Sequence, residues 1–289
     1  MRSLLFVPGD SERKLEKALS SGADALILDL EDSVSLSRKQ VARELAAAFL
    51  KDAPKDGPRL YVRINDLGSA FADDDLAAIV GAGPQGIILP KSNGGPDVVQ
   101  LSARLNVHEA EAGLAEGSTE IIAIATETAI GTLSLASYRN STPRLAGLSW
   151  GAEDLSAAIG ARTARDEDGN YTDPFRLARS LTLLGAAAAD VTAIDTVYVN
   201  LKDEAGLIRE CAAAERDGFT AKLAIHPAQI PVINAAFTPS PEAIDKARRI
   251  VAAFAEAPQA GVVALDGEMV DRPHLKRAER LLARVGSAF

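Results

Sequence analysis

The feature that most constrains the fold is a unit repeated about eight times, in which a short apolar run typical of a β-strand precedes a segment typical of a helix. Most of the runs are continuously hydrophobic, as expected for parallel strands covered on both faces. The runs are LLFV (4–7), ALILDL (25–30), RLYVRI (59–64), GIILP (86–90), EIIAIAT (120–126), LAGLSW (145–150), IDTVYV (194–199) and KLAI (222–225). Eight such units predict an α/β protein with a closed (β/α)8 TIM barrel.

The expected helices lie between these runs. They cover residues 11–21, 38–51, 70–82, 96–105, 131–138, 173–189, 203–217 and 241–257. An open, doubly wound sheet is the alternative arrangement of such units. The first strand ends in VPGDSERK, however, and lacks the GxGxxG pattern of a dinucleotide site, which favours the barrel.

The last part of the chain exceeds what the barrel needs. We therefore expect a catalytic barrel domain over residues 1–257 and a C-terminal extension, a lid or oligomerisation segment, over residues 258–289. Within the extension, two apolar runs flank Asp266-Gly267, which is a strong signal for a β-hairpin. A basic helix, HLKRAERLLARV, is expected to follow the hairpin.

Composition excludes several classes of function. The net charge of −9 argues against a nucleic-acid partner. No run of about eighteen apolar residues is present, so no membrane partner is expected. The lone Cys211 cannot form an internal disulfide, which fits a reducing compartment, and we expect a cytoplasmic protein.

Barrel active sites lie at the carboxyl ends of the strands, so the polar residues at those ends are the candidates. They are Asp29, Glu31, Asp32, Arg63, Asn65, Lys91, Glu127, Glu153, Asp154, Asn200 and His226. The three acids of LEDSV are costly to bury without partners. They are therefore expected to share the barrel mouth with Arg63 and Lys91.

Two kinds of chemistry are indicated at this mouth. Arg63 and Lys91 can hold anionic groups of a substrate, or they can form structural ion pairs with the acids of LEDSV. Glu127 and Asp154 follow successive strands, and a pair of carboxylates completed by water suits Mg²⁺. A zinc site is not expected, because the three histidines lie far apart in the sequence.

A second group of candidates lies beside this mouth. Arg13 and Lys17 are four residues apart and share one face of the first helix, where they can be solvated or can contact the phosphates of a long anionic cofactor. His226 follows the last strand and precedes a proline, so it can contact a ligand or cap a backbone group.

Nine motifs, in order along nearly the whole chain, resemble the citrate lyase beta-subunit-like family of the aldolase/citrate lyase superfamily. They are RSLLFVPGDSERKLEKA, LILDLEDSV, YVRIN, ILPK, IATETAIG, LSWGAEDLSAAIG, AIDTVYV, KLAIHPAQI and GEMVDRPHLKRAERLLA. The resemblance implies a Mg²⁺-dependent TIM-barrel lyase that makes or breaks a carbon–carbon bond beside a coenzyme A thioester. Citryl-, malyl-, methylmalyl- or citramalyl-CoA are the implied substrates, an oxo acid is the second product, and homotrimers or homohexamers are the implied assemblies.

The resemblance also implies roles for individual residues. It assigns Glu127 and Asp154 to the metal, with Glu127 also near the substrate, and Arg63 to the oxo acid. Coenzyme A is assigned to Arg13 and Lys17, which contact its phosphates, and to Ile225 and His226, which contact the rest. Asp271 is assigned as a general base supplied by a neighbouring subunit. One departure is Thr220-Ala221, where relatives often have glycine, which would narrow the approach of coenzyme A.

Three other functions remain open at this stage. A Mg²⁺-dependent aldolase of hydroxy-keto acids would share the metal pair without needing coenzyme A. A malyl-CoA thioesterase would admit water to the same site. A non-catalytic beta subunit of a citrate lyase complex would bind metal and thioester without turnover by itself.

Overall fold

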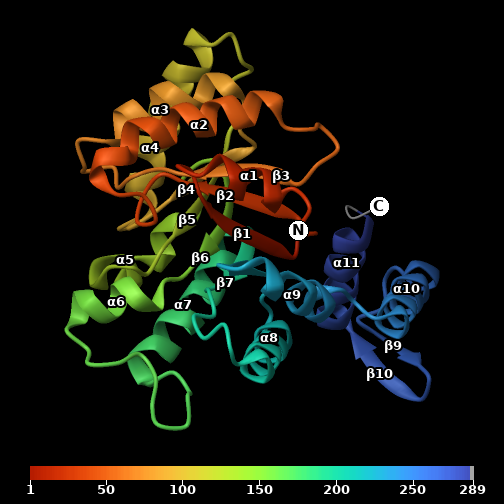
Figure 1. Cartoon of the computed structure of the whole chain (residues 1–289). Helices are drawn as coiled ribbons and strands as arrows, with labels where there is room; N and C mark the ends of the chain where they lie inside the picture. The colour runs from red at the N-terminus through yellow and green to blue at the C-terminus, as the bar shows by residue number, and fades with distance from the viewer. Residues whose placement is uncertain (287–289) are drawn as a thin grey trace. The chain divides into compact units, whose positions relative to one another are not determined.

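The computed structural model describes residues 1–286, and its first 235 residues contain a closed parallel barrel (Figure 1). Each strand pairs with the next in sequence, and β8 returns to β1 with Leu4 opposite Leu223. The strands are β1 (Ser3–Pro8), β2 (Ala25–Asp29), β3 (Arg59–Arg63), β4 (Gly86–Leu89), β5 (Glu120–Ile124), β6 (Leu145–Ser149), β7 (Thr192–Asp195) and β8 (Ala221–Ala224). The predicted TIM barrel is confirmed.

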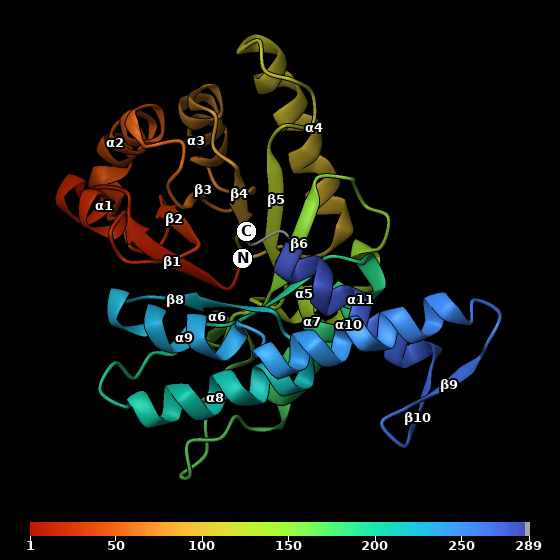
Figure 2. The same cartoon turned by 90° about the vertical axis from the view of Figure 1, so that its right-hand side faces the viewer.

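Helices surround the strands on the outside of the barrel (Figure 2). They are α1 (Glu12–Ala18), α2 (Lys39–Asp52), α3 (Ala72–Ile79), α4 (Gly95–Glu111), α5 (Ala129–Leu133), α6 (Ala152–Ile159), α7 (Asp173–Ala189), α8 (Glu204–Asp217) and α9 (Ile230–Phe237). Leu26, Ile27 and Leu28 of β2 are all fully buried although successive side chains of a strand point to opposite faces. Strands covered on both sides explain why the sequence shows continuous apolar runs instead of alternation.

The elements differ from the sequence-based expectations at three places. Helices α6 and α9 were not expected, and β7 ends at Asp195, although the apolar run continues to Val199. Beyond the strand, the carbonyl of Tyr198 accepts a hydrogen bond from Gln229 instead of a ladder partner. The apolar run therefore continues into a loop that is fixed by a side chain.

The chain divides into two compact units, one from Arg2 to Ala235 and the other from Ala236 onward. The second unit contains α10 (Pro241–Glu256), β9 (Val262–Leu265), β10 (Glu268–Asp271) and α11 (Arg272–Gly286). Its hairpin is antiparallel, as the Asp-Gly signal predicts. Within residues 1–286, no helix is long and apolar enough to cross a membrane.

The C-terminal unit has its own apolar core. Ile250 and Phe254 of α10 pack with Val270 of the hairpin and Ala278 of α11. The sequence-based boundary after residue 257 assigned α10 to the barrel domain. In the structure α10 belongs to the C-terminal unit, because its apolar face packs against the hairpin and α11. Residues 287–289 of the expected extension lie outside the described part of the chain.

Candidate active site

Arg63, the last residue of β3, is held by the acids that end β2. Its Nε and Nη2 donate to the two carboxylate oxygens of Asp29, both at 2.7 Å, and its Nη1 lies 2.9 Å from Glu31. The guanidinium also lies 4.8 Å from the centre of the Phe6 ring. Burial opposes the charge of Arg63, but the bonds to Asp29 and the nearby charges of Glu31 and Asp32 together raise the pKa of the guanidinium. The structural ion pair that the sequence allowed is therefore present, and Arg63 is a fixed cation.

Lys91, which follows β4, contacts acids from three other strand ends. Its Nζ bonds to Glu31 and lies 3.4 Å from Asp154 and 3.7 Å from Asp32. Its backbone N–H donates to Glu127 Oε2 at 2.5 Å. Burial opposes its charge, but the bond to Glu31 and the nearby carboxylates raise the pKa of Lys91. The acids of LEDSV therefore share the barrel mouth with Arg63 and Lys91, as expected.

The carboxylates of Glu127 and Asp154 differ in exposure. Glu127 is 4% exposed, whereas the side chain of Asp154, in the first turn of α6, is 34% exposed. Burial, together with the neighbouring charges of Asp154 and Glu31, raises the pKa of Glu127 to about 8. Burial likewise raises the pKa of Glu31 to about 7. One buried and one accessible carboxylate thus lie in a region crowded with acidic groups. A further cation among them would relieve the repulsion between the carboxylates.

The donor set of this site fits Mg²⁺. Only oxygen ligands are offered, and Mg²⁺ prefers one or two carboxylates and keeps several waters. Within residues 1–286, no group of three or more His, Cys, Asp or Glu side chains is arranged to hold a metal ion. The site therefore suits a hydrated hard cation better than a metal that requires a closed protein cage. Glu127 and Asp154 are the two residues that would hold it.

The expected coenzyme A contacts are on the surface of the barrel unit. Arg13 and Lys17 are exposed on α1, and Ile225 and His226 are exposed after β8. His226 Nδ1 accepts a hydrogen bond from the N–H of Ala228 at 3.1 Å, so it caps the following helical turn. Capping, one of the two roles that the sequence left open, is therefore present.

Asp271 ends β10 in the C-terminal unit and pairs with His274 on α11. Its carboxylate lies 2.5 Å from His274 Nδ1, and about half of its side-chain surface is exposed. The hydrogen bond with His274 lowers the pKa of Asp271. The carboxylate of Asp271 is therefore accessible and held in its ionised form.

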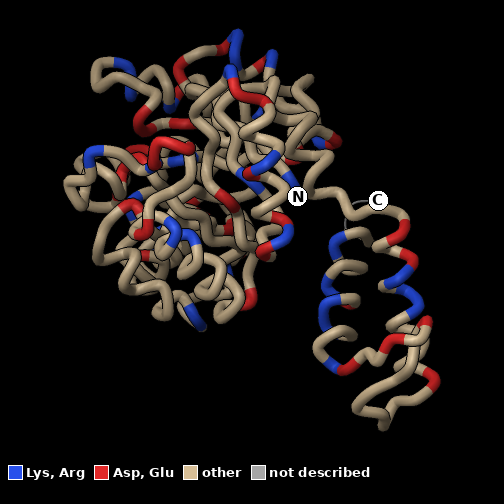
Figure 3. Tube along the Cα trace, turned by 90° about the horizontal axis from the view of Figure 1, so that it is seen from below, with Lys and Arg blue, Asp and Glu red and all other residues tan. Residues whose placement is uncertain are grey.

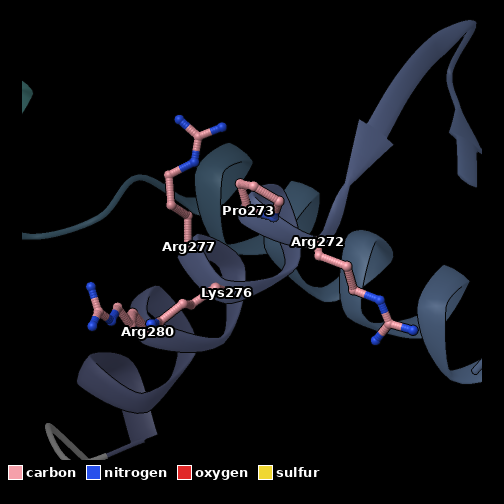
Figure 4. Close-up of a pocket in the computed structure, with 5 residues that line it drawn as sticks. All are labelled: Arg272, Pro273, Lys276, Arg277 and Arg280. Atoms are coloured by element: carbon pink, nitrogen blue, oxygen red, sulfur yellow. The ribbon is translucent and has the colours of Figure 1, made fainter. Parts of the chain in front are cut away.

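The helix that follows Asp271 carries a basic hollow. Figure 3 shows Lys and Arg positions along the C-terminal helix, and the hollow, of about 640 Å³, is lined by Arg272, Pro273, Lys276, Arg277 and Arg280. In Figure 4 the guanidinium groups of Arg272 and Arg277 extend in different directions. Arg272 donates to the carbonyl oxygens of Pro258 and Ala260, which ties α11 to the loop before the hairpin.

Two further residues, which were not predicted from the sequence, shape the site. A Cβ at Gly151 would lie 2.7 Å from Glu127 Cγ, so only glycine leaves room for that carboxylate. Gln229 is buried, and its side-chain oxygen accepts from the N–H groups of Ile225 and His226 while its nitrogen donates to the Tyr198 carbonyl. The glycine before the acids of WGAEDL and the glutamine of HPAQ were visible, but only the packing shows what they contact.

Comparison with known proteins places these features in a family. Residues 2–227 match the profile of the family described as HpcH/HpaI aldolase/citrate lyase. A "Citrate lyase subunit beta-like protein" of Mycobacterium tuberculosis is 38% identical over 284 residues, which cover 98% of this chain and 95% of that protein. A "(3S)-malyl-CoA thioesterase" of Cereibacter sphaeroides is 36% identical over 289 residues, covering 98% and 94% of the two chains.

A solved structure matches nearly the full length of the chain. It is the crystal structure of protein CitE from Mycobacterium tuberculosis in complex with magnesium, acetoacetate and coenzyme A. The two chains are 37% identical, with a TM-score of 0.77, and the match covers 99% of this chain and 98% of the other.

Proposed function

Because the chain belongs to the HpcH/HpaI aldolase/citrate lyase family, we propose that it is a Mg²⁺-dependent lyase that cleaves a 3-hydroxyacyl-CoA into an acyl-CoA and an oxo acid. Citryl-, malyl-, methylmalyl- and citramalyl-CoA are the candidate substrates. The observation that carries the proposal is the pair Glu127 and Asp154, which both contact Lys91 at neighbouring strand ends. A structurally similar relative holds magnesium, an oxo acid and coenzyme A in one complex.

The metal and Arg63 are proposed to have separate roles in the reaction. Bound Mg²⁺ would supply a Lewis acid that acidifies the substrate hydroxyl and polarises the carbonyl that forms when the carbon–carbon bond breaks. Arg63, held by Asp29, is a fixed cation that can stabilise negative charge on the oxo acid or on the thioester enolate. Such a preoriented charge needs no rearrangement during the reaction.

Asp271 is proposed as the acid–base group. In the condensation direction it would remove a proton from the carbon next to the thioester, and in cleavage the same group would return a proton to that carbon. The ionised state favoured by His274 is the one required for proton removal. We propose that Asp271 acts in the site of a neighbouring subunit, within a homotrimer or homohexamer.

The coenzyme A part of the substrate would bind along the surface of the barrel unit. We propose that Arg13 and Lys17 contact its phosphates, and that Ile225 and His226 contact the remainder. The support is exposure of all four side chains and the fixed backbone of the turn after β8. A cytoplasmic location, inferred from the single cysteine, remains a prediction.

A thioesterase is the second candidate, because the relative from Cereibacter sphaeroides carries that name. The same metal pair would serve, but water would attack the thioester and release free coenzyme A together with an intact hydroxy acid. The two activities differ in their products, so they can be separated in a single assay.

The test is to incubate the purified protein with Mg²⁺ and each candidate thioester, with and without chelator, and to follow products by mass spectrometry. Metal-dependent formation of acetyl- or propionyl-CoA with the matching oxo acid is expected. Free coenzyme A with intact hydroxy acid would identify the thioesterase. Cleavage of a hydroxy-keto acid without coenzyme A would support an aldolase, and binding without turnover would support a dependent subunit.

A further inference from the structure

Lys91 has a backbone conformation that its residue type rarely adopts. Its φ is +50°, in the left-handed region. Among residues 1–286, the other non-glycine residues with positive φ are Asn140, Asp190 and Asp266. Asn and Asp visit this region because their short side chains can bond locally, whereas lysine has no such compensation. Strain of this kind persists only where the surroundings impose it, and it is concentrated at functional sites.

The conformation lets one residue contact the site twice. The backbone N–H of Lys91 is directed at Glu127, while the side chain runs to the opposite acids and places Nζ beside Glu31 and Asp154. Lys91 therefore links the ends of β2, β5 and β6 from its own position after β4. Its ammonium group lies 3.4 Å from Asp154, one of the two carboxylates that would hold a divalent cation.

We propose that Lys91 is an internal cation that competes with the divalent metal for the carboxylate of Asp154 and so sets how tightly the metal is held. This inference rests on the proposed function, because it takes Glu127 and Asp154 as the metal ligands. The Lys91 ammonium lies 3.4 Å from Asp154, so its charge would repel a divalent metal bound to that carboxylate. Metal binding then requires the Lys91 ammonium to give up its contact with Asp154.

The exposure of the groups supports exchange at Asp154. The side chains of Asp154 and Lys91 are 34% and 28% exposed, whereas that of Glu31 is 7% exposed. The partly exposed contact, which is also the longer one, is the easier to break, and Lys91 can keep its buried partner Glu31 when it does. Weakened metal binding would let the ion be gained and lost with the substrate instead of being held permanently.

The test uses the full chain and Mn²⁺ as the probe, with free Mn²⁺ measured by electron paramagnetic resonance. Lys91→Met removes the charge and keeps the length of the side chain. Lys91→Gly removes the charge and also suits the left-handed backbone, so it guards against misfolding of the first variant. Lys51→Met, an exposed lysine at the end of α2, is the matched control.

Both Lys91 variants are expected to bind Mn²⁺ at least about tenfold more tightly than the parent protein, while the control stays within about twofold. A larger rise in Tm on adding Mn²⁺ is expected for the same two variants. Parent-like or weaker Mn²⁺ binding in both variants would overturn the inference and leave the metal site standing. Failure of the parent protein itself to bind Mn²⁺ would instead overturn the proposed metal site, and the inference with it.

Discussion

Arg144 and Glu109 form a doubly bonded ion pair in which Arg144 Nη1 donates to Oε1 at 2.7 Å and Nη2 donates to Oε2 at 2.5 Å. Both side chains are almost fully buried. Glu109 also accepts from the N–H groups of Gly117 and Thr119, so the pair ties α4 to the residues that lead into β5. Burial opposes the charge of Glu109, but these bonds outweigh it and lower its pKa to about 2.

The pair is expected to make the barrel sensitive to acid. A carboxyl group whose pKa is lowered on folding stabilises the protein above its unfolded value of about 4.5, and this stabilisation is lost as the pH falls from there toward about 2. Urea unfolding of Glu109→Gln should therefore show a weaker decline in unfolding free energy over this range than the parent. Exposed Glu116→Gln is the control, and an identical decline in both variants would contradict the prediction.

Removing one member of the pair is expected to lower the unfolding free energy more than removing a surface charge does. Arg144→Met leaves a buried carboxylate without its cation, which typically destabilises a protein by about 3–5 kcal/mol. The loss should appear as a lower urea midpoint at pH 7. A loss below about 1 kcal/mol, the range of exposed pairs, would show that water replaces the guanidinium.

Gly151→Ala is expected to damage the metal site without unfolding the barrel. The added methyl would lie 2.7 Å from Glu127 Cγ, so the carboxylate must move. Mn²⁺ binding should weaken by about tenfold or more, equivalent to at least about 1.4 kcal/mol. Gly261→Ala, whose added methyl meets nothing within 4 Å, is the matched control. Parent-like Mn²⁺ affinity in Gly151→Ala would remove Glu127 from the metal site.

Asp271→Asn is expected to lower kcat by about 10²- to 10⁴-fold, the usual contribution of an acid–base group, with metal binding preserved. If Asp271 serves a neighbouring subunit, mixing this variant with inactive Glu127→Gln and allowing subunits to exchange should restore part of the activity. Mixed assemblies then contain sites in which both residues are intact. Full activity of Asp271→Asn alone would exclude the proposed role.

Gln229→Met is expected to weaken thioester binding and to leave metal binding unchanged. The change removes the three hydrogen bonds that hold Ile225, His226 and the Tyr198 carbonyl. The KM for the coenzyme A substrate should rise by about tenfold while Mn²⁺ affinity stays unchanged. Exposed Gln100→Met on α4 should leave both unchanged. An equal loss of metal affinity would mean that the turn supports the whole barrel mouth.

The barrel could be predicted because each strand can be recognised from its own short apolar run of residues. Runs such as ALILD are apolar throughout and end at charged residues, so they indicate both the strands and the edge where the site lies. Helices α6 and α9 were harder to predict, since each begins within a few residues of a strand end or a turn. Short helices of this kind depend on packing more than on their own sequence.

The contacts within the site depend on distances that sequence does not contain. That Arg63 and Lys91 face the acids of LEDSV followed from strand order, but the two bonds from Arg63 to Asp29 did not. The left-handed backbone of Lys91 had no glycine or asparagine to signal it. The grouping of α10 with the hairpin likewise requires knowledge of which apolar face meets which.

The C-terminal unit, with its separate core around Phe254 and Val270, has a consequence for how this kind of enzyme can diverge. The carboxylates proposed for the metal lie in the barrel, whereas Asp271 lies on a segment that packs largely against itself. If Asp271 has the proposed acid–base role, substitutions in that segment would change proton transfer without changing the barrel residues. On that proposal, related proteins could keep the same metal site and differ in their products through changes in this last fifth of the chain.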